Sequence, residues 1–501
     1  MSKTTIQKFS SALPWAILLK VIGALIGFLT SIVIVRGLGP YDYGVLSILS
    51  FIFGLISLTV AFGLDRALLR YIPELNVKDK VYGIKNTLLS IIIVQMLVWA
   101  SILLLIYFTK GLISDMFSMD LEMYLLIGTL LILVSVYGGN FSGVLISLYD
   151  FKYVTFISTI TGIANILLIV LLLKLNWGII GILVAGAIAS LISIVFYLYI
   201  LKLRISSKVK KDGRGIELIR ILKFSAPLVV SGMLVMITWM QSEVLFLGLF
   251  VGAVEVGYFN LAFSLSQQAM AFVPLSIYSL GLISFVEGYT KDRDNLRTAV
   301  DLQYKLVYIV VAPISVMGIL FADKAVIILY GEQMATAASI IPIFFIIFSI
   351  SFLGHCTGLV LTTLERTDVM MTISIVVAVI NLLFDYIFIK QYGLIGAVIA
   401  FFGTIVLSKL IEIPITMKFF AQFRIPLKFI GKCYLATLPI LPLALIESYI
   451  TNIYTLVILS IVGVGLSIIG IKLVGLVGKE EKKIIEISNV PFKKTIIRIL
   501  G

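Results

Sequence analysis

Residues 178–201 read GIIGILVAGAIASLISIVFYLYIL and contain no Asp, Glu, Lys or Arg. About 20 apolar residues in an α-helix cross the hydrocarbon core of a bilayer, which is roughly 30 Å thick. The segment is therefore expected to be a membrane-spanning helix. It also bears on the whole fold, because its opening glycines, Gly178 and Gly181, recur in the second half of the chain as Gly393 and Gly396.

The composition of the chain is typical of a protein with many membrane-spanning helices. Of its 501 residues, 60% are hydrophobic and 13% are charged, whereas soluble chains are about half apolar and a quarter charged. Both cysteines, Cys356 and Cys433, lie in apolar runs and form no disulfide framework. The net charge of +13 would suit nucleic acid, but the basic residues lie between apolar segments. This pattern indicates a polytopic membrane protein whose basic loops meet anionic lipid headgroups, with no nucleic-acid partner.

Hydropathy predicts an all-α integral membrane protein with about 14 transmembrane helices. The connecting loops are short and leave no room for a sizeable soluble domain. The predicted spans lie near 11–35, 43–65, 84–108, 121–146, 153–174, 178–201, 222–248, 256–286, 302–322, 336–363, 370–389, 393–420, 428–447 and 453–475.

The distribution of Lys and Arg predicts the orientation of these spans. With the N-terminus inside, the inner segments hold 32 basic residues and the outer loops hold 5. Cytoplasmic loops of membrane proteins carry such an excess. We therefore expect a multi-pass protein of the cell (cytoplasmic) membrane with both termini in the cytoplasm, and an even number of spans.

The two halves of the chain share patterns at a nearly constant offset. The segment 39–44 matches 252–257, and the glycine, asparagine and alanine positions in 165–185 match those in 381–400. The offset carries span 1 onto span 7, so both copies have the same orientation. Parallel six-helix repeats of this kind occur in alternating-access transporters, around a central cavity. A duplicated channel or a purely structural bundle is the alternative.

The repeat predicts five parts of the chain. These are an N-terminal six-helix lobe (1–205), a basic cytoplasmic linker (206–221), a C-terminal six-helix lobe (222–420), two additional transmembrane helices (421–478) and a basic cytoplasmic tail (479–501). The tail mixes apolar and basic residues, which is typical of a segment lying on the anionic inner leaflet.

The sequence lacks three common motifs of nucleotide-binding, zinc-binding and hydrolytic proteins. It has no G-x-x-x-x-G-K-[ST] phosphate loop, no zinc-type Cys/His cluster and no G-x-S-x-G elbow, and its single histidine is His355. We expect no enzyme activity, no cofactor and no metal site. Transport would then draw on an ion gradient (H⁺ or Na⁺), on the membrane potential or on the substrate's own concentration difference.

Lys20 is the ionisable residue predicted inside span 1, roughly 13 Å deep at 1.5 Å per residue. Gly23 and Gly27 share its helical face. Ionisable groups at membrane depth usually face a cavity or a partner. The pattern predicts a cation that lines a central cavity. Alternatively, Lys20 extends to the inner headgroups while the glycines pack against another helix.

Other charges fall in later predicted spans. Lys409 is a second candidate cavity cation, but Glu412 follows at the i, i+3 spacing, where the two can pair with each other. Glu412 and Glu243 are candidate coupling or cavity carboxylates. His355 takes the place of Asn140 in the repeat, so we expect it to pack between helices, with proton transfer as the second interpretation.

Two stretches carry a family resemblance. Residues 35–44, VRGLGPYDYG, and residues 62–74, FGLDRALLRYIPE, resemble the "R-x-L-G-P-x-x-Y-G" and "G-L-x-x-A-x-x-R-Y" motifs of the Wzx-type polysaccharide flippases. These belong to the multidrug/oligosaccharidyl-lipid/polysaccharide exporter (MOP) superfamily. The stretches provide a predicted gate or interfacial motif. Its residues are Arg36, Gly39, Tyr43, Gly44, Asp65, Arg66 and Arg70.

The resemblance implies two lobes like those of the MATE exporters and a flippase that moves an isoprenoid-phosphate- or pyrophosphate-linked oligosaccharide from the inner to the outer leaflet. It also implies that Lys20 and Lys409 meet the anionic headgroup of this substrate, and that other glycan-assembly proteins are partners. A cation-coupled multidrug exporter and a lipid II flippase of the same superfamily are alternatives, although span 1 carries Lys20 where such drug exporters typically carry an acid. A membrane glycan polymerase or ligase would need a large external loop, which the sequence lacks.

Overall fold

Helices make up nearly all of the computed structural model, which describes residues 3–77, 81–206, 215–239, 242–291 and 293–476. Within these ranges there is no β-strand. The predicted tail 479–501 and residues 207–214 of the predicted linker lie outside the described residues. The chain divides into two compact units, Met1–Val256 and Gly257–Gly501, so α7 and α8 fall in the first. The domain boundaries expected from the repeat stay predictions.

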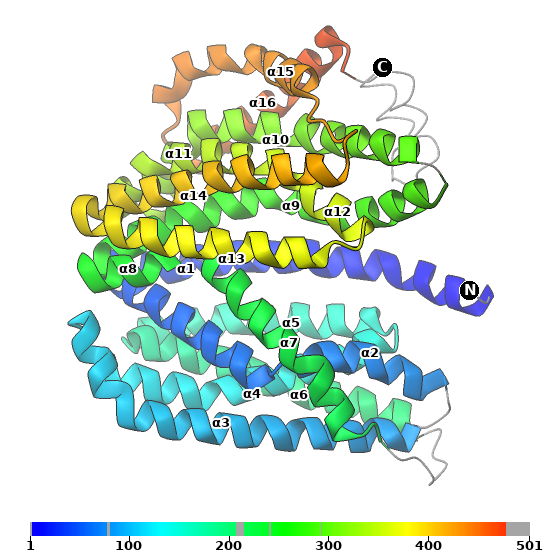
Figure 1. The fold of residues 1–501 in the computed structure, drawn as a ribbon. Coiled ribbons are helices and arrows are strands. Elements are labelled where there is room, and N and C mark those ends of the chain that lie inside the picture. The colour runs from blue at the N-terminus through cyan, green and yellow to red at the C-terminus, as the bar shows by residue number, and fades with distance from the viewer. Residues whose placement is uncertain (1–2, 78–80, 207–214, 240–241, 292, 477–501) are drawn as a thin grey trace. The chain divides into compact units, whose positions relative to one another are not determined.

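The first unit contains eight labelled helices (Figure 1). They are α1 (Lys3–Ala61), α2 (Leu64–Val77), α3 (Val81–Phe117), α4 (Glu122–Ser147), α5 (Phe151–Lys174), α6 (Gly178–Ser206), α7 (Leu218–Trp239) and α8 (Ser242–Phe250).

The second unit begins within α9. Its elements are α9 (Ala253–Lys291), α10 (Arg293–Tyr330), η1 (Glu332–Met334), α11 (Ala335–Ser351), η2 (Phe352–Gly354), α12 (His355–Thr363), α13 (Thr367–Phe384), η3 (Asp385–Ile389), α14 (Lys390–Phe419), α15 (Leu427–Leu435), η4 (Leu438–Tyr449) and α16 (Ile453–Val474).

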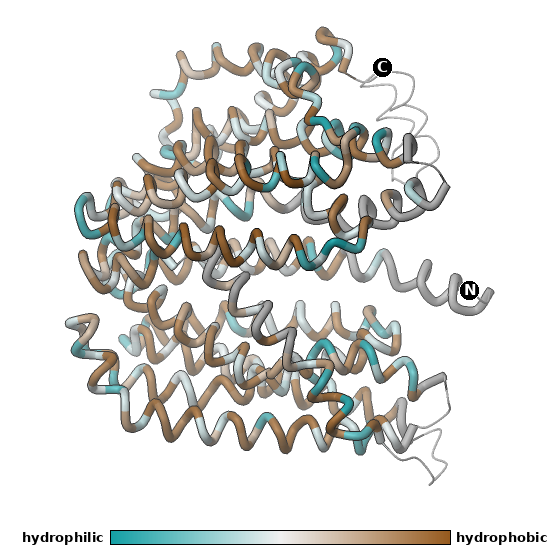
Figure 2. Tube along the Cα trace, viewed as in Figure 1, coloured by the Kyte–Doolittle hydropathy of each residue, from teal (hydrophilic) through white to brown (hydrophobic). Residues whose placement is uncertain are grey.

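Among the described residues, nine helical stretches are long and apolar enough to cross a membrane, or ten if α15 and η4, bent by 41°, form one span. Two of the nine, Leu18–Leu75 and Thr367–Phe419, each contain two of the predicted spans. The helices α7 and α9 occupy the two remaining predicted positions. Figure 2 shows the hydrophobic colour running along α3 to α6, with hydrophilic residues near the turns that join them. The predicted all-helical membrane fold is confirmed.

Small residues allow the helices of the first unit to pack closely. In Figure 1, α3, α4, α5 and α6 run side by side, and α5 also lies along α1. A Cβ atom placed on Gly162 of α5 would lie 2.9 Å from Ile26 of α1. Gly248 of α8 packs in the same way against Ile48 of α1. Because lipid tails are as apolar as leucine, membrane helices associate through such packing rather than through the hydrophobic effect.

The last helices of the second unit pack against α10. Gly463 of α16 lies against Met317 of α10, where a Cβ atom would approach the side chain to 2.9 Å. Tyr434 of α15 forms hydrogen bonds with Ser349 of α11 and, at 3.4 Å, with Ser315 of α10. The two additional helices are therefore joined to this unit by packing and by side-chain hydrogen bonds.

The backbone carries the repeat that the sequence predicts. Turns with positive φ occur in matching pairs at a nearly constant separation along the chain, each near a helix junction. The pairs, with their φ values, are Gly39 (77°) and Gly252 (145°), Ser118 (53°) and Gly331 (96°), Tyr149 (64°) and Glu365 (57°), and Gly178 (52°) and Gly393 (57°). Positive φ is uncommon outside glycine, so these matched pairs support a duplicated helix arrangement.

Two departures from the α-helix were not predicted. Residues Asp385–Ile389 form a π-helical segment between α13 and α14. Residues Leu438–Tyr449 form a long 3₁₀ helix that contains Pro439 and Pro442. Proline has no backbone N–H group, so these two positions cannot complete α-helical hydrogen bonds. A hydropathy average over about 20 residues does not detect such local changes in the backbone hydrogen-bond pattern.

Candidate functional site

Lys20 lies on a face of α1 that other described residues leave open. The side chain is exposed, and so are Gly23 and Gly27 on the same helical face. A Cβ atom on either glycine would meet no other atom within 4 Å. The opposite face packs against α5, where Ile26 meets Gly162. Within the first unit, α1 thus has a packed side and an open side, and the lysine is on the open side.

The predicted motif after the first span forms a sharp bend in α1. Gly39 has φ 77° and ψ 178°, a combination that is essentially limited to glycine. Tyr43 and Gly44 follow in the next turn and are buried. Arg36 is exposed about one turn before the bend. The motif therefore sets the angle between the two halves of α1, and Arg36 lies at that bend.

The second part of the motif lies on α2. Asp65 and Arg66 are exposed at the start of the helix. Arg70 contacts Glu74 at 3.5 Å, and Arg220 of α7 contacts the same carboxylate at 3.6 Å. Exposed ion pairs of this kind stabilise a fold by about 0–1 kcal/mol each. This network links α2 to α7 within the first unit.

Both guanidinium groups of this network also contact one aromatic ring. Arg70 and Arg220 lie 5.6 and 5.0 Å from the centre of the Tyr71 ring. The ring in turn meets Phe224 of α7 edge to face. The aromatic and ionic contacts together give α2 and α7 a defined packing at the predicted cytoplasmic end.

Lys409 and Glu412 lie in a polar cluster inside the second unit. Lys409 Nζ is 2.8 Å from Glu412 Oε2, and the lysine is 7% exposed. Thr357 Oγ1 is 3.4 Å from the same carboxylate oxygen. A Cβ atom on Gly354 would lie 2.7 Å from Lys409 Nζ and from Glu412 Oε2. The absence of a side chain at Gly354 therefore makes room for the ion pair.

His355 lies beside this cluster. Its Nε2 atom is 3.1 Å from Gln303 Nε2 on α10. In the first unit, Asn140 Nδ2 donates to Gln95 Oε1 at 2.6 Å. Asn140 and His355, which match in the repeat, thus each contact a glutamine on another helix, although Gln95 and Gln303 themselves are 208 residues apart and do not match in the repeat. Both contacts join neighbouring helices, which agrees with the packing interpretation of His355.

Glu243, the other candidate carboxylate, lies in the short helix α8. The side chain is only 2% exposed. Close packing of Gly248 against Ile48 and Phe117 holds α8 on α1 and α3. Glu243 is therefore a buried carboxylate that belongs to the first unit, whereas the cluster around Lys409 belongs to the second.

Asp385 is a buried carboxylate that the sequence analysis overlooked. It is 0% exposed and begins the π-helical segment, with Asn381 Nδ2 at 3.5 Å from its Oδ1 atom. The same Asn381 amide lies 3.5 Å from Thr404 Oγ1 on α14. Single π-helical turns are frequent at functional sites. A signal was present, because Asp385 is the only acidic residue between Asp368 and Glu412.

Taken over the described residues, these positions form separate groups rather than one catalytic constellation. No group of three or more His, Cys, Asp or Glu side chains there could hold a metal ion. The first unit offers an exposed cation on an open helix face, and the second offers a buried ion pair among hydroxyl and amide groups. Such groups can bind and release an anion or a proton.

The chain matches a known family over more than half of its length. Residues 13–280 match the model of the family described as "Polysaccharide biosynthesis protein". The chain belongs to this family. A relative in Methanocaldococcus jannaschii, an uncharacterized membrane protein, is 23% identical over 97% of this chain and 98% of its own length.

Solved structures share the fold. The inward-facing form of a multidrug resistance MATE family transporter of the MOP superfamily aligns with a TM-score of 0.67 at 17% identity, over 79% of this chain and 94% of its own. The lipid II flippase MurJ in an inward closed conformation aligns with a TM-score of 0.60 at 16% identity, over 86% and 98%. The MATE-like fold expected from the resemblance is confirmed.

One further solved structure is a MOP superfamily transporter from Pyrococcus furiosus. It aligns with a TM-score of 0.56 at 16% identity, over 80% of this chain and 93% of its own. The binding pocket of that protein has a reverse polarity, which suggests a different function for it. The chain is thus a multi-pass membrane protein of the polysaccharide biosynthesis family with the fold of MOP superfamily transporters.

Proposed function

We propose that the protein is a flippase for a lipid-linked oligosaccharide. It moves an isoprenoid-phosphate- or pyrophosphate-linked glycan from the inner to the outer leaflet of the cytoplasmic membrane by alternating access of two lobes. The family, the flippase among the structural neighbours and the sequence motifs support this proposal. The protein supplies a pathway and makes or breaks no covalent bond, so it is not an enzyme.

The observation that carries the proposal is the position of Lys20. An ammonium group at membrane depth is costly in contact with hydrocarbon. The open face of α1, with Gly23 and Gly27 beside the lysine, leaves space for a large headgroup. A phosphate group of the lipid carrier would neutralise the ammonium charge, and the small glycines would let sugars approach the helix.

Lys409 has a different setting and takes a different role in the proposal. Its ammonium group already lies 2.8 Å from Glu412, so an incoming phosphate would compete with a carboxylate. We assign the first contact with the headgroup to Lys20. Later in the transport cycle, the Lys409–Glu412 ion pair separates so that Lys409 contacts the phosphate, or so that Glu412 exchanges a proton. The coupling ion is H⁺ or Na⁺.

The orientation follows from charge. The 32 basic residues on one side against 5 on the other support cytoplasmic termini and an entry on the inner leaflet. Membrane lipids with anionic headgroups are expected partners at that side, together with other proteins of glycan assembly.

A substitution series at Lys20 tests the proposal. In proteoliposomes with a fluorescent isoprenoid-linked oligosaccharide, we expect Lys20→Ala to lose most transport and Lys20→Arg to retain part, because charge survives while geometry changes. Lys20→Glu should be the least active, since it repels the phosphate. Equal insertion is checked by reconstituted protein amount. Full transport by Lys20→Glu would rule out the headgroup contact.

The same vesicles separate the alternatives. A cationic drug and lipid II replace the glycan lipid in parallel assays, with Lys174→Glu, at an exposed lysine of α5, as the matched control. Transport of a cationic drug that improves in Lys20→Glu would instead identify a multidrug exporter. Transport of lipid II alone would identify a lipid II flippase.

A further inference from the structure

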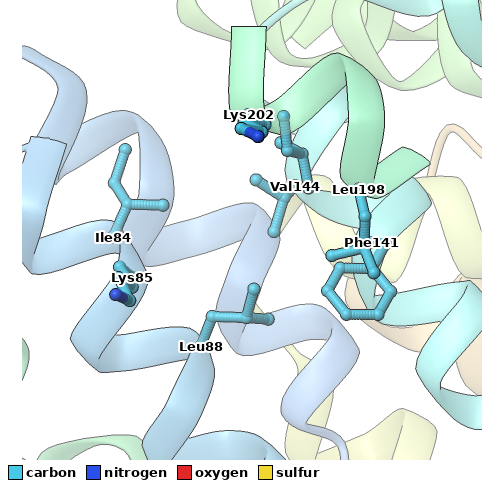
Figure 3. Close-up of a pocket in the computed structure, with 8 residues that line it drawn as sticks. Ile84, Lys85, Leu88, Phe141, Val144, Leu198 and Lys202 are labelled. Atoms are coloured by element: carbon cyan, nitrogen blue, oxygen red, sulfur yellow. The ribbon is translucent and has the colours of Figure 1, made fainter. Parts of the chain in front are cut away.

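A pocket of about 350 Å³ between α3, α4 and α6 in the first unit is lined mostly by apolar side chains, among them Leu88, Phe141 and Val144 (Figure 3). Binding pockets obtain their specificity from a few precisely placed polar groups, and this lining supplies little of that kind. Buried polar contacts gather instead in the second unit, where α10 and α14 meet the short turn η2 and the start of α12. The second unit therefore has the better-defined polar geometry.

The η2 turn interrupts a membrane helix where the sequence gives no proline, since residues 343–363 contain none. Residues Phe352–Gly354 join α11 to α12, and the His355 N–H group donates to the Phe352 carbonyl, three residues back. A 3₁₀ helix turns by about 120° per residue and an α-helix by about 100°, so three residues rotate α12 by roughly 60° relative to an uninterrupted helix. The turn thus determines which face of α12 meets α14.

Two consecutive residues of α10 contact the two sides of this turn. The Tyr304 hydroxyl donates to the Leu353 carbonyl at 2.6 Å, and the tyrosine side chain is fully buried. Gln303 Nε2 lies 3.1 Å from Nε2 of His355, the first residue of α12. Buried backbone carbonyls need a hydrogen-bond donor. The contact from Tyr304 therefore stabilises the backbone of η2 from a neighbouring helix.

The turn places Gly354 against the Lys409–Glu412 pair. A Cβ atom on Gly354 would lie 2.7 Å from Lys409 Nζ and from Glu412 Oε2, so a side chain at this place would displace one of the two. Thr357 Oγ1, three residues further along α12, lies 3.4 Å from Glu412 Oε2. A rotation of α12 by roughly 60° would move both residues and bring another side chain toward the pair. The 2.8 Å contact of the pair therefore depends on the 3₁₀ form of η2.

We propose that Tyr304 is a positioning residue for the Lys409–Glu412 pair. Through the Leu353 carbonyl it keeps η2 in the 3₁₀ form, and η2 keeps Gly354 beside the pair. A 3₁₀ stretch inside a helix often marks a hinge. When the Tyr304 hydroxyl leaves Leu353, η2 becomes α-helical, α12 rotates and the ion pair separates. This inference rests on the proposed function for one step, the separation of the pair during transport.

A thermodynamic cycle in detergent tests the positioning without a transport assay. Thermal unfolding of the full-length protein measures how far Lys409→Met lowers the melting temperature in the wild-type and in the Tyr304→Phe background. We expect a much smaller loss in Tyr304→Phe, because the pair is already displaced there. Tyr308→Phe is the matched control. The Tyr308 hydroxyl also donates from α10, at 3.1 Å to the Ser349 carbonyl, but Ser349 lies in α11 before the turn.

Two further variants show whether the hydroxyl and the turn are responsible. p-Aminophenylalanine at position 304 keeps a hydrogen-bond donor in place of the hydroxyl and should restore the wild-type loss. Gly354→Ala acts on the same contact from α12 and should reduce the loss as Tyr304→Phe does. A wild-type loss in Tyr304→Phe or in Gly354→Ala would overturn the proposal. An equal reduction in Tyr308→Phe would also overturn it, because general packing of α10 would then explain the result.

Proteoliposomes with the glycan lipid test the step that rests on the proposed function. Tyr304→Phe should lower kcat about fivefold, the equivalent of one hydrogen bond. Its KM should stay unchanged, because Lys20 makes the first contact with the headgroup. A changed KM with an unchanged kcat would overturn the assignment to a later step. If the thermodynamic cycle succeeds but the wild-type protein moves no glycan lipid, the proposed function fails and the positioning role of Tyr304 stands.

Discussion

The side-chain amides of Gln95 on α3 and Asn140 on α4 form two hydrogen bonds with each other. Asn140 Nδ2 donates to Gln95 Oε1 at 2.6 Å, and Gln95 Nε2 lies 3.4 Å from Asn140 Oδ1. Both residues are almost fully buried. In the second unit, Gln303 and His355 form the corresponding contact at 3.1 Å. The matched positions Asn140 and His355 thus both form a polar contact with a glutamine, with different chemistry in each copy.

The reciprocal amide pair predicts an asymmetric response to substitution. Asn140→Leu should destabilise the fold by about 1–2 kcal/mol, because it leaves the buried Gln95 amide without this partner. Gln95→Leu together with Asn140→Leu should cost less than the single change, since both polar groups are then gone. Thermal unfolding in detergent, followed by size-exclusion chromatography, shows which of the variants loses more stability.

Asn165 supplies the control for this experiment. Its Oδ1 atom is buried with no hydrogen-bond partner among the described residues, so Asn165→Leu should cost little. If the double substitution proves as costly as the sum of the single ones, the two amides do not stabilise each other.

The Lys409–Glu412 pair predicts a separation of stability from transport. Lys409→Met should cost about 3 kcal/mol, because a largely buried carboxylate loses its cationic partner. Adding Glu412→Gln should restore most of that stability, as measured by thermal unfolding in detergent. If Lys409 also contacts the headgroup, the double variant is stable but transports poorly. A double variant that is stable and fully active would show that the Lys409–Glu412 pair has only a structural role.

The bend at Gly39 predicts a strong residue preference. Gly39→Ala should cost about 1–3 kcal/mol, because φ 77° with ψ 178° is strained for any residue with a Cβ atom. Gly186→Ala in α6 is the matched control. Its Cβ atom would meet nothing within 4 Å, and alanine favours the helix by about 0.5–1 kcal/mol. Equal melting temperatures for the two variants would contradict the strained bend.

The charge asymmetry predicts the topology. Reporter fusions at Gly501 and within residues 206–214 should be active only as cytoplasmic reporters, because both sites adjoin the most basic segments of the chain. A fusion after Lys110, in a predicted outer loop, provides the opposite control. An external signal at Gly501 would contradict the expected cytoplasmic C-terminus.

The sequence predicted the fold well because the relevant signals are long and repeated. A span is an average over about 20 residues, so errors at single positions do not remove it. The repeat was visible because turns such as Gly39 and Gly252 need glycine for backbone reasons. These features depend on local chain properties, which a single sequence contains.

The site was harder to predict, because it depends on contacts between helices. The sequence placed Lys409 and Glu412 within pairing distance, and the structure forms that pair. No feature of the sequence indicated that Gly354, on an earlier helix, makes room for the pair. Gln95 was overlooked for the same reason, since one amide in an apolar run has no meaning until its partner is known.

The matched turns give the polypeptide an internal reference for mutagenesis. Gly178 and Gly393 adopt nearly the same φ, 52° and 57°, in copies that share one chain. Every molecule therefore carries each twin once, in the same lipid. When the two single variants are compared at equal amounts of inserted protein, a difference in phenotype measures how far the two copies have diverged in function.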